Sequence, residues 1–298
     1  MFYYSAYNLR IASELPLPEF APAGRGGDVE IRLRAPRRLQ AARAIEWGTD
    51  TVRFCYPNAA EFIVRGGDSV EIFPEPSMDL PLLRLYIQGM IFAALLRQRG
   101  LFVLHASVVE AGDSVIAFVG PVGAGKSTLA AAFHLRGARV LADDNAALQW
   151  RATGPIVMPA FPSIKIYPDV AAAIGYERDG LQVMHRSQKK RAQVICGGFL
   201  NRPSPIEAIY VLDRNAAPAP QALTPVESMV EMIRHSVPTR WGVAGDAAHL
   251  ETSGRFARAI PMFRVRTFRN LEEIPQVIDC IGGHRAEGAG SLTRGVGM

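Results

Sequence analysis

The segment GPVGAGKS at residues 120–127 constrains this chain most, because it matches the pattern G-x-x-x-x-G-K-[ST]. The apolar run SVIAFVG precedes it and the alanine-rich run KSTLAAAFHLRG follows it, so we expect the segment to join a buried strand to a helix. Glycines in such a loop let successive backbone N–H groups point at a phosphate, and the helix N-terminus adds partial positive charge. Because strands and helices continue to alternate after it, we predict an α/β fold with a P-loop core.

This loop predicts a site for a nucleoside triphosphate, which we expect to be ATP. The Lys126 ammonium is placed to neutralise the β and γ phosphates, and the Ser127 hydroxyl is placed to bind Mg²⁺. The predicted nucleotide-binding residues are Gly120, Val122, Gly123, Ala124, Gly125, Lys126, Ser127 and Thr128.

Two adjacent carboxylates, Asp143 and Asp144, close the next predicted strand, RVLADD. Parallel strands end at one edge of a sheet, where ligands bind, so we expect the pair beside the phosphate loop. One carboxylate can hold Mg²⁺, and we assign Asp144 to the metal together with Ser127. A second carboxylate without a metal bond can take the proton of an attacking hydroxyl. The alternative is that one aspartate only caps the following segment.

A histidine and three further cations complete the set of candidates. We expect a hairpin to place His105, in LHAS, beside the phosphate-loop strand, although a satisfied core histidine is an equally open interpretation. Only four of the 33 basic residues are lysines, which favours a function for each lysine. Outside the loop, the candidate phosphate or substrate clamp consists of Lys165, Lys189, Lys190 and Arg191. The alternative for SQKKRAQ is a solvated basic loop.

The chain divides by pattern into three parts. Residues 1–77 contain only strand-like segments, among them FYYSAYNLRIA, DVEIRLR and a hairpin that turns at Gly66-Gly67-Asp68. Residues 78–283 form the predicted kinase-type domain, led by a long, mostly buried helix from about residue 80 to residue 98. The glycine-rich residues 284–298 are predicted to be disordered.

Composition restricts the partners and the location. The net charge of +5 suggests nucleic acid, but the basic residues are scattered, so we expect neither nucleic acid nor a membrane as a partner. Three distant cysteines and the lack of a signal-peptide pattern at the N-terminus predict a cytoplasmic protein. The sequence does not decide between a monomer and a homo-oligomer.

Together, LHASVV, GPVGAGKS and LADD resemble the HPr kinase/phosphorylase superfamily over roughly residues 100–235. In that family a histidine precedes the phosphate loop and two aspartates end the next strand. The resemblance implies that Asp143 activates the acceptor hydroxyl, that Asp144 and His105 support it, and that Mg²⁺ binds between Ser127 and the carboxylates. It also implies Lys126 as a catalytic residue.

The chain departs from true HPr kinases in two places. It has Thr128 where they carry an acidic residue, and it lacks their segment resembling E-[IL]-R-G-[IL]-G-[IL] after the aspartate pair. The segments YNLRIASELPLPEF, LHASVV and KKRAQVICGG are more similar to serine kinases of lasso-peptide biosynthesis, which act on the C-terminal serine of the precursor peptide. The alternatives are an HPr-type kinase/phosphorylase, a small-molecule kinase and a nucleotide-hydrolysing regulator.

Overall fold

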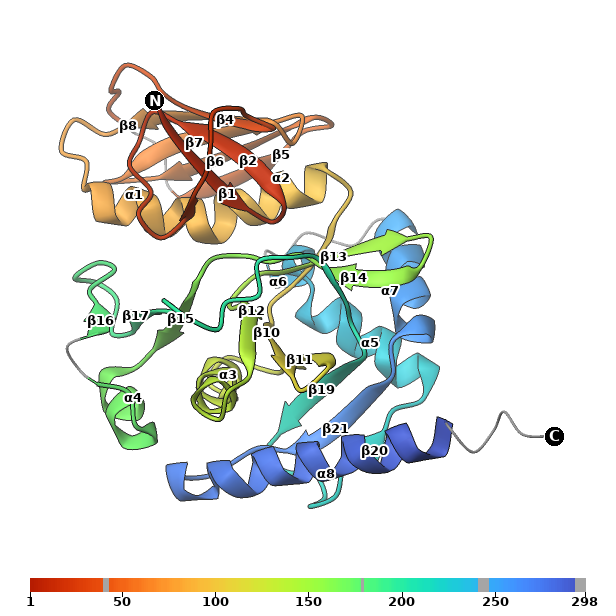
Figure 1. Ribbon diagram of the computed structural model, residues 1–298. Coiled ribbons are helices and arrows are strands. Elements are labelled where there is room, and N and C mark those ends of the chain that lie inside the picture. The colour runs from red at the N-terminus through yellow and green to blue at the C-terminus, as the bar shows by residue number, and fades with distance from the viewer. Residues whose placement is uncertain (40–42, 178–179, 241–246, 293–298) are drawn as a thin grey trace.

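The structure is a computed structural model that describes residues 1–39, 43–177, 180–240 and 247–292. It is a mixed α/β protein with several sheets, and Figure 1 shows two layers, with the N-terminal layer at the top. The N-terminal layer contains an eight-stranded sheet in the order β3-β1-β2-β4-β8-β7-β6-β5. Its strands are β1 Phe2–Ala6, β2 Leu9–Ser13, β3 Ala21–Pro22, β4 Val29–Leu33, β5 Ala44–Trp47, β6 Thr51–Tyr56, β7 Ala60–Arg65 and β8 Ser69–Pro74.

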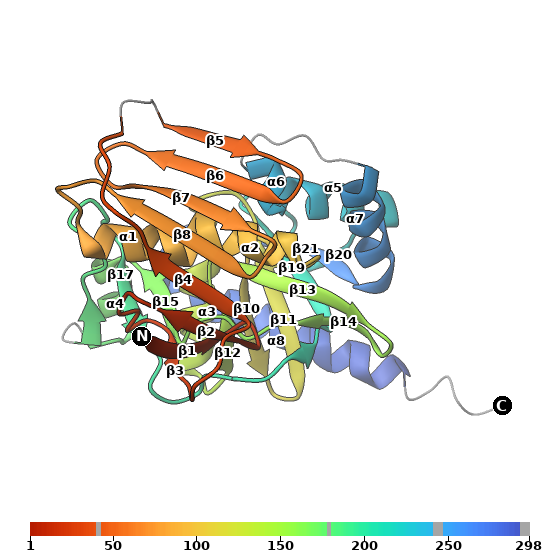
Figure 2. The same cartoon turned by 90° about the horizontal axis from the view of Figure 1, so that it is seen from above.

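The hairpin at Gly66-Gly67 is confirmed, since both glycines have positive φ and join β7 to β8. The prediction of one strand over FYYSAYNLRIA is wrong. Tyr7 and Asn8, with φ of 54° and 59°, turn the chain so that β1 pairs antiparallel with β2. Figure 2 shows the sheet from above, with β5 at one side and β1 to β3 at the other.

A helical run follows the first sheet and lies against it (Figure 1). It consists of α1 Leu80–Tyr86, a π-helical turn η1 Ile87–Ile91 and α2 Phe92–Gln98. By length and composition this run could span a membrane, but half of its most apolar window is buried within the protein. Its burial under the sheet accounts for its apolar character.

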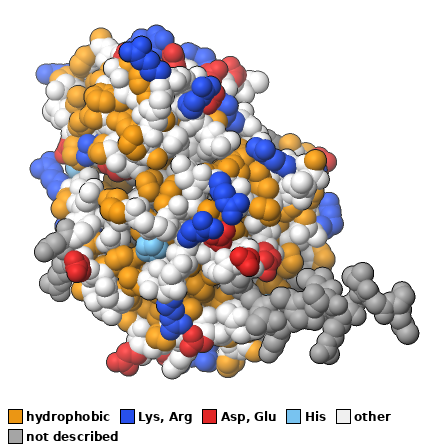
Figure 3. All heavy atoms as spheres, viewed as in Figure 1, with side chains coloured by type: hydrophobic (Ala, Val, Ile, Leu, Met, Phe, Trp, Pro, Cys, Tyr) orange, Lys and Arg blue, Asp and Glu red, His pale blue; other side chains and the backbone are white. Residues whose placement is uncertain are grey.

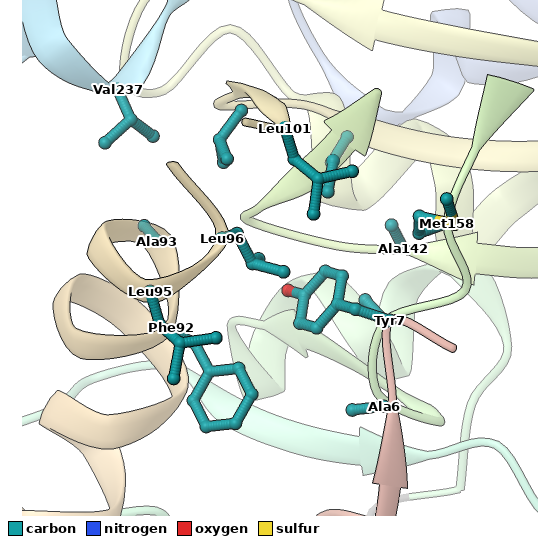
Figure 4. Packing of buried hydrophobic residues seen from close by; sticks show 14 of the residues in the cluster. Ala6, Tyr7, Phe92, Ala93, Leu95, Leu96, Leu101, Ala142, Met158 and Val237 are labelled. Atoms are coloured by element: carbon teal, nitrogen blue, oxygen red, sulfur yellow. The ribbon is translucent and has the colours of Figure 1, made fainter. Parts of the chain in front are cut away.

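One buried cluster joins the two layers. The Tyr7 ring lies 6.0 Å from the Phe92 ring and 5.4 Å from the Phe161 ring, measured between centroids. Figure 4 shows Tyr7 and Phe92 close to Leu96, Ala142 and other residues that come from both layers. The first sheet, the helical run and the second layer therefore share a core.

The second layer is built on a six-stranded sheet in the order β12-β10-β11-β19-β21-β20. Strands β11, β19 and β21 are parallel, and β10 lies antiparallel between β11 and β12. Smaller sheets have the orders β18-β14-β13-β9 and β15-β17-β16. The strands are β9 Phe102–Leu104, β10 Ser107–Ala111, β11 Ser114–Val119, β12 Arg139–Ala142, β13 Ala146–Arg151, β14 Gly154–Val157, β15 Ser163–Ile166, β16 Leu181–Gln182, β17 Arg191–Val194, β18 Ser204–Pro205, β19 Ala208–Asp213, β20 Gln221–Ala222 and β21 Met262–Arg266.

Helices cover both faces of the six-stranded sheet. Side chains of α3 and α8 form one core with β11 and β19, while α5 and α7 contribute to the other core. A capping box formed by Thr224 and Glu227 begins α5. The helices are α3 Lys126–Leu135, α4 Pro168–Ile174, α5 Pro225–His235, α6 Val237–Arg240, α7 Ala247–Ala259, η3 Leu271–Glu273 and α8 Ile274–Leu292.

The prediction that residues 284–298 are disordered is wrong for residues 284–292, because α8 runs from Ile274 to Leu292. His284 anchors this part of the helix, since its ring lies 4.3 Å from the Phe263 ring and its Nδ1 is 3.2 Å from the Tyr210 hydroxyl. Residues 293–298 lie outside the described residues.

Charge on the face in Figure 3 is dispersed. Lys and Arg side chains occur over both layers, and hydrophobic or uncharged side chains separate them. On this face the described basic side chains are therefore mixed with other residue types rather than gathered in one patch.

Candidate active site

The loop at residues 120–125 connects β11 to α3 and depends on its glycines. Gly120, Gly123 and Gly125 have φ values of 153°, 82° and 95°. These values favour glycine, because other residues rarely adopt them. At Gly125 a Cβ atom would also lie 2.4 Å from the Phe268 ring. The sequence therefore satisfies both the backbone conformation and the packing that the loop needs.

Lys126 is held across this loop at the N-terminus of α3. Its Nζ donates hydrogen bonds to the carbonyl oxygens of Gly120, at 2.8 Å, and Pro121, at 3.1 Å. The Thr267 hydroxyl donates to the Ala124 carbonyl at 2.9 Å and fixes the loop from the end of β21. The ammonium of this buried lysine is thus held among the backbone groups that would surround a phosphate.

The sheet order explains how the histidine, the aspartates and the loop come together. Strand β10 runs antiparallel between β11 and β12, so its first residue lies where the other two strands end. Ser107 begins β10, the loop follows β11, and Asp143 follows β12. His105 precedes β10 and therefore lies at the same edge.

Asp143 is buried, and each of its carboxylate oxygens accepts one hydrogen bond. Its Oδ1 accepts from the Ser107 hydroxyl at 2.6 Å, and its Oδ2 accepts from the backbone N–H of Lys165 at 2.8 Å. Each carboxylate oxygen has two lone pairs, so each can accept one further hydrogen bond or proton. These two donors fix the orientation of the carboxylate.

Asp144 has a left-handed backbone, with φ of 78°, which aspartate tolerates better than most residues. Its Oδ2 lies 2.8 Å from Lys165 Nζ, and its Oδ1 lies 3.1 Å from His105 Nδ1. Burial raises the pKa of the Asp144 carboxyl, but the Lys165 charge and the His105 hydrogen bond lower it by more, so it lies well below its usual range. Asp144 is therefore ionised at neutral pH.

Lys165 belongs to β15 and contacts both aspartates. Burial lowers the pKa of its ammonium, but the charge of Asp144 raises it by more, so the net shift is upward. Asp144 and Lys165 consequently form a permanent ion pair at neutral pH. The sequence singled out Lys165 as a clamp, and the structure places its ammonium on Asp144.

The surroundings of His105 define the position of its proton. Nδ1 lies 2.9 Å from the Asp144 carbonyl oxygen, which can only accept a hydrogen bond. Nδ1 therefore carries a hydrogen. In the neutral ring Nε2 therefore carries no hydrogen, and its lone pair can accept a proton.

A cavity of about 280 Å³, which we call the central cavity, brings these groups together. The loop contributes Gly125, Lys126 and Ser127 to its wall, and His105 and both aspartates line the other side. Lys165 and Lys190 also line it. The remaining candidates lie differently, because the Lys189 side chain is exposed and Arg191 donates to the Gln188 carbonyl at 2.9 Å.

The central cavity has donor groups that suit Mg²⁺. The Ser127 hydroxyl and the two carboxylates are hard oxygen ligands, which Mg²⁺ prefers alongside water and phosphate oxygens. Among the described residues no group of three or more His, Cys, Asp or Glu side chains could hold a metal alone. The residues thus fit a Mg²⁺ ion that is held in part by a nucleotide's phosphates.

A larger cavity of about 800 Å³ borders the other side of the loop, from Gly120 to Ala124. Its wall contains Glu231, which pairs with Arg234 at 2.7 Å and with Arg264 at 3.3 Å. Arg214 and Asp213 also line it, so three arginines face two carboxylates and the lining keeps an excess of positive charge.

Sequence patterns did not indicate three residues that shape the site, namely Ser107, Tyr7 and Asn145. Ser107 bonds Asp143, and its position two residues after His105 in LHAS was the available signal. The Tyr7 hydroxyl donates to the Asn145 carbonyl at 3.2 Å. Burial, with the charges of Asp144 and Asp143, raises the pKa of Tyr7 well above its usual value, so this hydroxyl remains protonated.

Comparison with known proteins gives similarity to solved structures but to no family model. No family model and no curated protein matches the chain. Among solved structures, the chain is similar to the HPr(Ser) kinase/phosphatase from Coxiella burnetii, with a TM-score of 0.38 and 14% sequence identity. The similarity covers 64% of this chain and 95% of that protein.

Proposed function

We propose that this chain is a kinase that uses ATP and Mg²⁺ to phosphorylate a serine hydroxyl of a peptide or small protein. The observation that carries the proposal is the central cavity, where the phosphate loop faces two adjacent aspartates. One carboxylate is enough to support a metal in nucleotide hydrolysis. The second, held in a fixed orientation by Ser107, supports transfer to a hydroxyl.

The loop binds the triphosphate in this proposal. Backbone N–H groups of residues 123–128 receive the phosphate oxygens at the start of α3. Lys126 exchanges its bonds with the Gly120 and Pro121 carbonyls for bonds to the β and γ phosphates. Ser127 and Asp144 would hold Mg²⁺, which supplies positive charge against the charge that develops on the transferred phosphoryl group.

Asp143 is the proposed general base. As the acceptor oxygen forms its bond to the γ-phosphorus, the bond from that phosphorus to the β–γ bridging oxygen breaks and ADP leaves. The proton of the acceptor hydroxyl passes to Asp143. Ser107 and the Lys165 N–H hold the carboxylate for this transfer, which typically contributes about 10²–10⁴ in rate.

Asp144 has the complementary role of a fixed anion. Its low pKa makes it a poor proton acceptor, and its ion pair with Lys165 keeps it in place beside Asp143. His105 restrains it from the other side. The different environments of the two aspartates therefore suit Asp143 to act as the base and Asp144 to act as a charged ligand.

For the acceptor, we propose the C-terminal serine of a lasso-peptide precursor. The similarity of YNLRIASELPLPEF, LHASVV and KKRAQVICGG to the kinases of those peptides supports this choice. The three cysteines are free, which agrees with a cytoplasmic location, where ATP is abundant.

An acceptor panel tests the proposal. The protein is incubated with ATP, Mg²⁺ and a peptide ending in serine, free serine, or no acceptor, and the products are weighed by mass spectrometry. We expect one added phosphoryl group on the peptide and none with the Lys126→Met variant. Phosphorylation of free serine alone would favour a small-molecule kinase, and phosphate release at the same rate without acceptor would favour a nucleotide-hydrolysing regulator.

A further inference from the structure

A second cavity, of about 600 Å³, lies between the helical run and the second layer, and we call it the acceptor cavity. Asp144, Lys165 and Lys190 line both this cavity and the central cavity. The two cavities therefore meet at the Asp144–Lys165 ion pair. A group that entered the acceptor cavity would approach the aspartates from the side opposite the phosphate loop.

Hydrogen bonds connect the wall of the acceptor cavity to Asn145, the residue that follows the two aspartates. The Asn145 side-chain amide donates to the backbone carbonyls of Gln88, at 3.2 Å, and Gly89, at 2.9 Å. These carbonyls belong to the π-helical turn η1, and wider turns of this kind often occur at functional sites. The residue after Asp144 thus fixes the helical run against the site.

The charges in the acceptor cavity favour an anion. Its charged lining residues are three cations, Arg43, Lys165 and Lys190, and one anion, Asp144. Because Lys165 is paired with Asp144, the other two cations have no anionic partner within the lining. Lys190 lies 5.5 Å from the Tyr167 ring centroid, and Arg43 lies 5.3 Å from that of Tyr56.

The same cavity also has an apolar, well-supported side. Tyr86 and Met90 line it, and the Tyr86 ring stacks on Tyr56 at 4.0 Å between centroids. Between them on the helical run, Gly89 leaves space, because a Cβ built there meets no atom within 4 Å. Gly89 lacks a positive φ, so its backbone does not require glycine. The missing side chain enlarges the cavity.

We propose that the acceptor cavity binds the end of an acceptor peptide whose carboxylate lies next to the hydroxyl that is phosphorylated. Arg43 and Lys190 bind the carboxylate, Tyr86 and Met90 contact an apolar neighbouring side chain, and the hydroxyl reaches Asp143 past the Asp144–Lys165 pair. This inference rests on the proposed function, and it assigns the N-terminal layer the task of selecting the acceptor.

The test fills the cavity with one side chain. Gly89→Leu places a branched side chain in the acceptor cavity and suits a helix better than glycine does. The matched control is Gly282→Leu, another helical glycine with nothing within 4 Å of its Cβ, in α8. The probe is the synthetic peptide Ala-Ala-Gly-Leu-Ser, used with a free carboxylate and as the C-terminal amide.

We expect Gly89→Leu to lower kcat/KM for the free-acid peptide by at least about tenfold, while ATP affinity stays at the wild-type value and the melting temperature does not fall. Gly282→Leu should leave kcat/KM and ATP affinity unchanged. For the wild type, the amide should be the poorer acceptor. If Gly89→Leu kept the wild-type kcat/KM, the inference would be overturned, and the proposed kinase activity would still stand.

Direct binding separates this inference from the proposed function. If the wild-type protein transfers no phosphoryl group to the peptide, the proposed function fails, and affinity for a fluorescent form of the same peptide decides about the cavity. Binding by the wild type and by Gly282→Leu, but not by Gly89→Leu, would support the acceptor cavity. Absence of binding by the wild type would overturn it.

Discussion

Lys165 Nζ lies 2.8 Å from Asp144 Oδ2, while the backbone N–H of the same lysine donates to Asp143. One residue on β15 therefore restrains both aspartates, one by a charge and the other by a main-chain hydrogen bond. This arrangement makes Asp144 a permanent anion and leaves Asp143 with neutral donors only. It is the physical basis for assigning different roles to neighbouring, chemically identical side chains.

Removing the charge of Lys165 should destabilise the protein. Losing one partner of a fully buried ion pair costs about 3–5 kcal/mol. Because the Asp144 side chain is 31% exposed, we expect a smaller loss for Lys165→Met, about 1–3 kcal/mol. Urea unfolding at neutral pH measures it, with Lys189→Met, at an exposed position, as the control. Equal stabilities of both variants would contradict a stabilising pair.

The same pair predicts how stability depends on pH. Asp144 has a lowered pKa in the folded state, so its contribution is complete above the unfolded pKa and is lost as the pH falls through the folded value. The difference in unfolding free energy between wild type and Lys165→Met should therefore shrink from about pH 5 downward. Urea unfolding at a series of pH values measures this difference. A difference that grows as the pH falls would contradict the prediction.

Asp143→Asn should retain nucleotide binding and lose transfer by about 10² or more, because the amide cannot accept the hydroxyl proton. Calorimetry with ATP and single-turnover transfer measure the two quantities. Asp144→Asn is the informative comparison, since it should weaken Mg²⁺-dependent binding as well. If Asp143→Asn stayed active while His105→Gln lost transfer, Nε2 of His105 would be the base instead.

Ser107→Ala should slow transfer by about tenfold without changing the KM for ATP. The variant removes the 2.6 Å hydrogen bond that orients Asp143, and hydrogen bonds to charged groups contribute about 1.5–3 kcal/mol. Ser204→Ala is a suitable control, because Ser204 is also buried and its hydroxyl donates to a local backbone carbonyl, that of Arg202. Unchanged kcat in Ser107→Ala would mean that Asp143 keeps its orientation without the serine.

The two neighbouring lysines at residues 189–190 should differ in effect. Lys190 lines both the central and acceptor cavities, whereas the Lys189 side chain is exposed. We expect Lys190→Met to raise the peptide KM by about tenfold, in the range for a hydrogen bond to a charged group, and Lys189→Met to leave it unchanged. Steady-state kinetics with varied peptide distinguishes them. Equal effects of the two variants would indicate that residues 189–190 form part of a general basic surface and do not bind the peptide specifically.

Local patterns predicted those parts of the structure that depend on neighbouring residues. The loop at Gly120–Ser127 and the turn at Gly66-Gly67 each follow from a few adjacent residues. The placement of His105 beside the loop strand followed from one expected hairpin. The residues that form each of these features lie close together along the chain, so the sequence alone predicts them.

The remaining features depend on packing between distant segments. Lys165 was noticed because lysine is scarce, but its contact with Asp144 requires β15 to pack beside the end of β12. Gly89 and Asn145 meet only because the helical run lies against the second layer. The helix over residues 284–292 was missed because its anchor, the contact of His284 with Phe263, bridges α8 and β21.

The ratio of phosphopeptide to ADP, measured in one reaction, tests the kinase assignment most directly. The protein is incubated with ATP, Mg²⁺ and a limiting serine-ended peptide, and both products are quantified over time. The account predicts one phosphopeptide for each ADP in the wild type and neither product with Lys126→Met. ADP that accumulates with free phosphate and without phosphopeptide would contradict it.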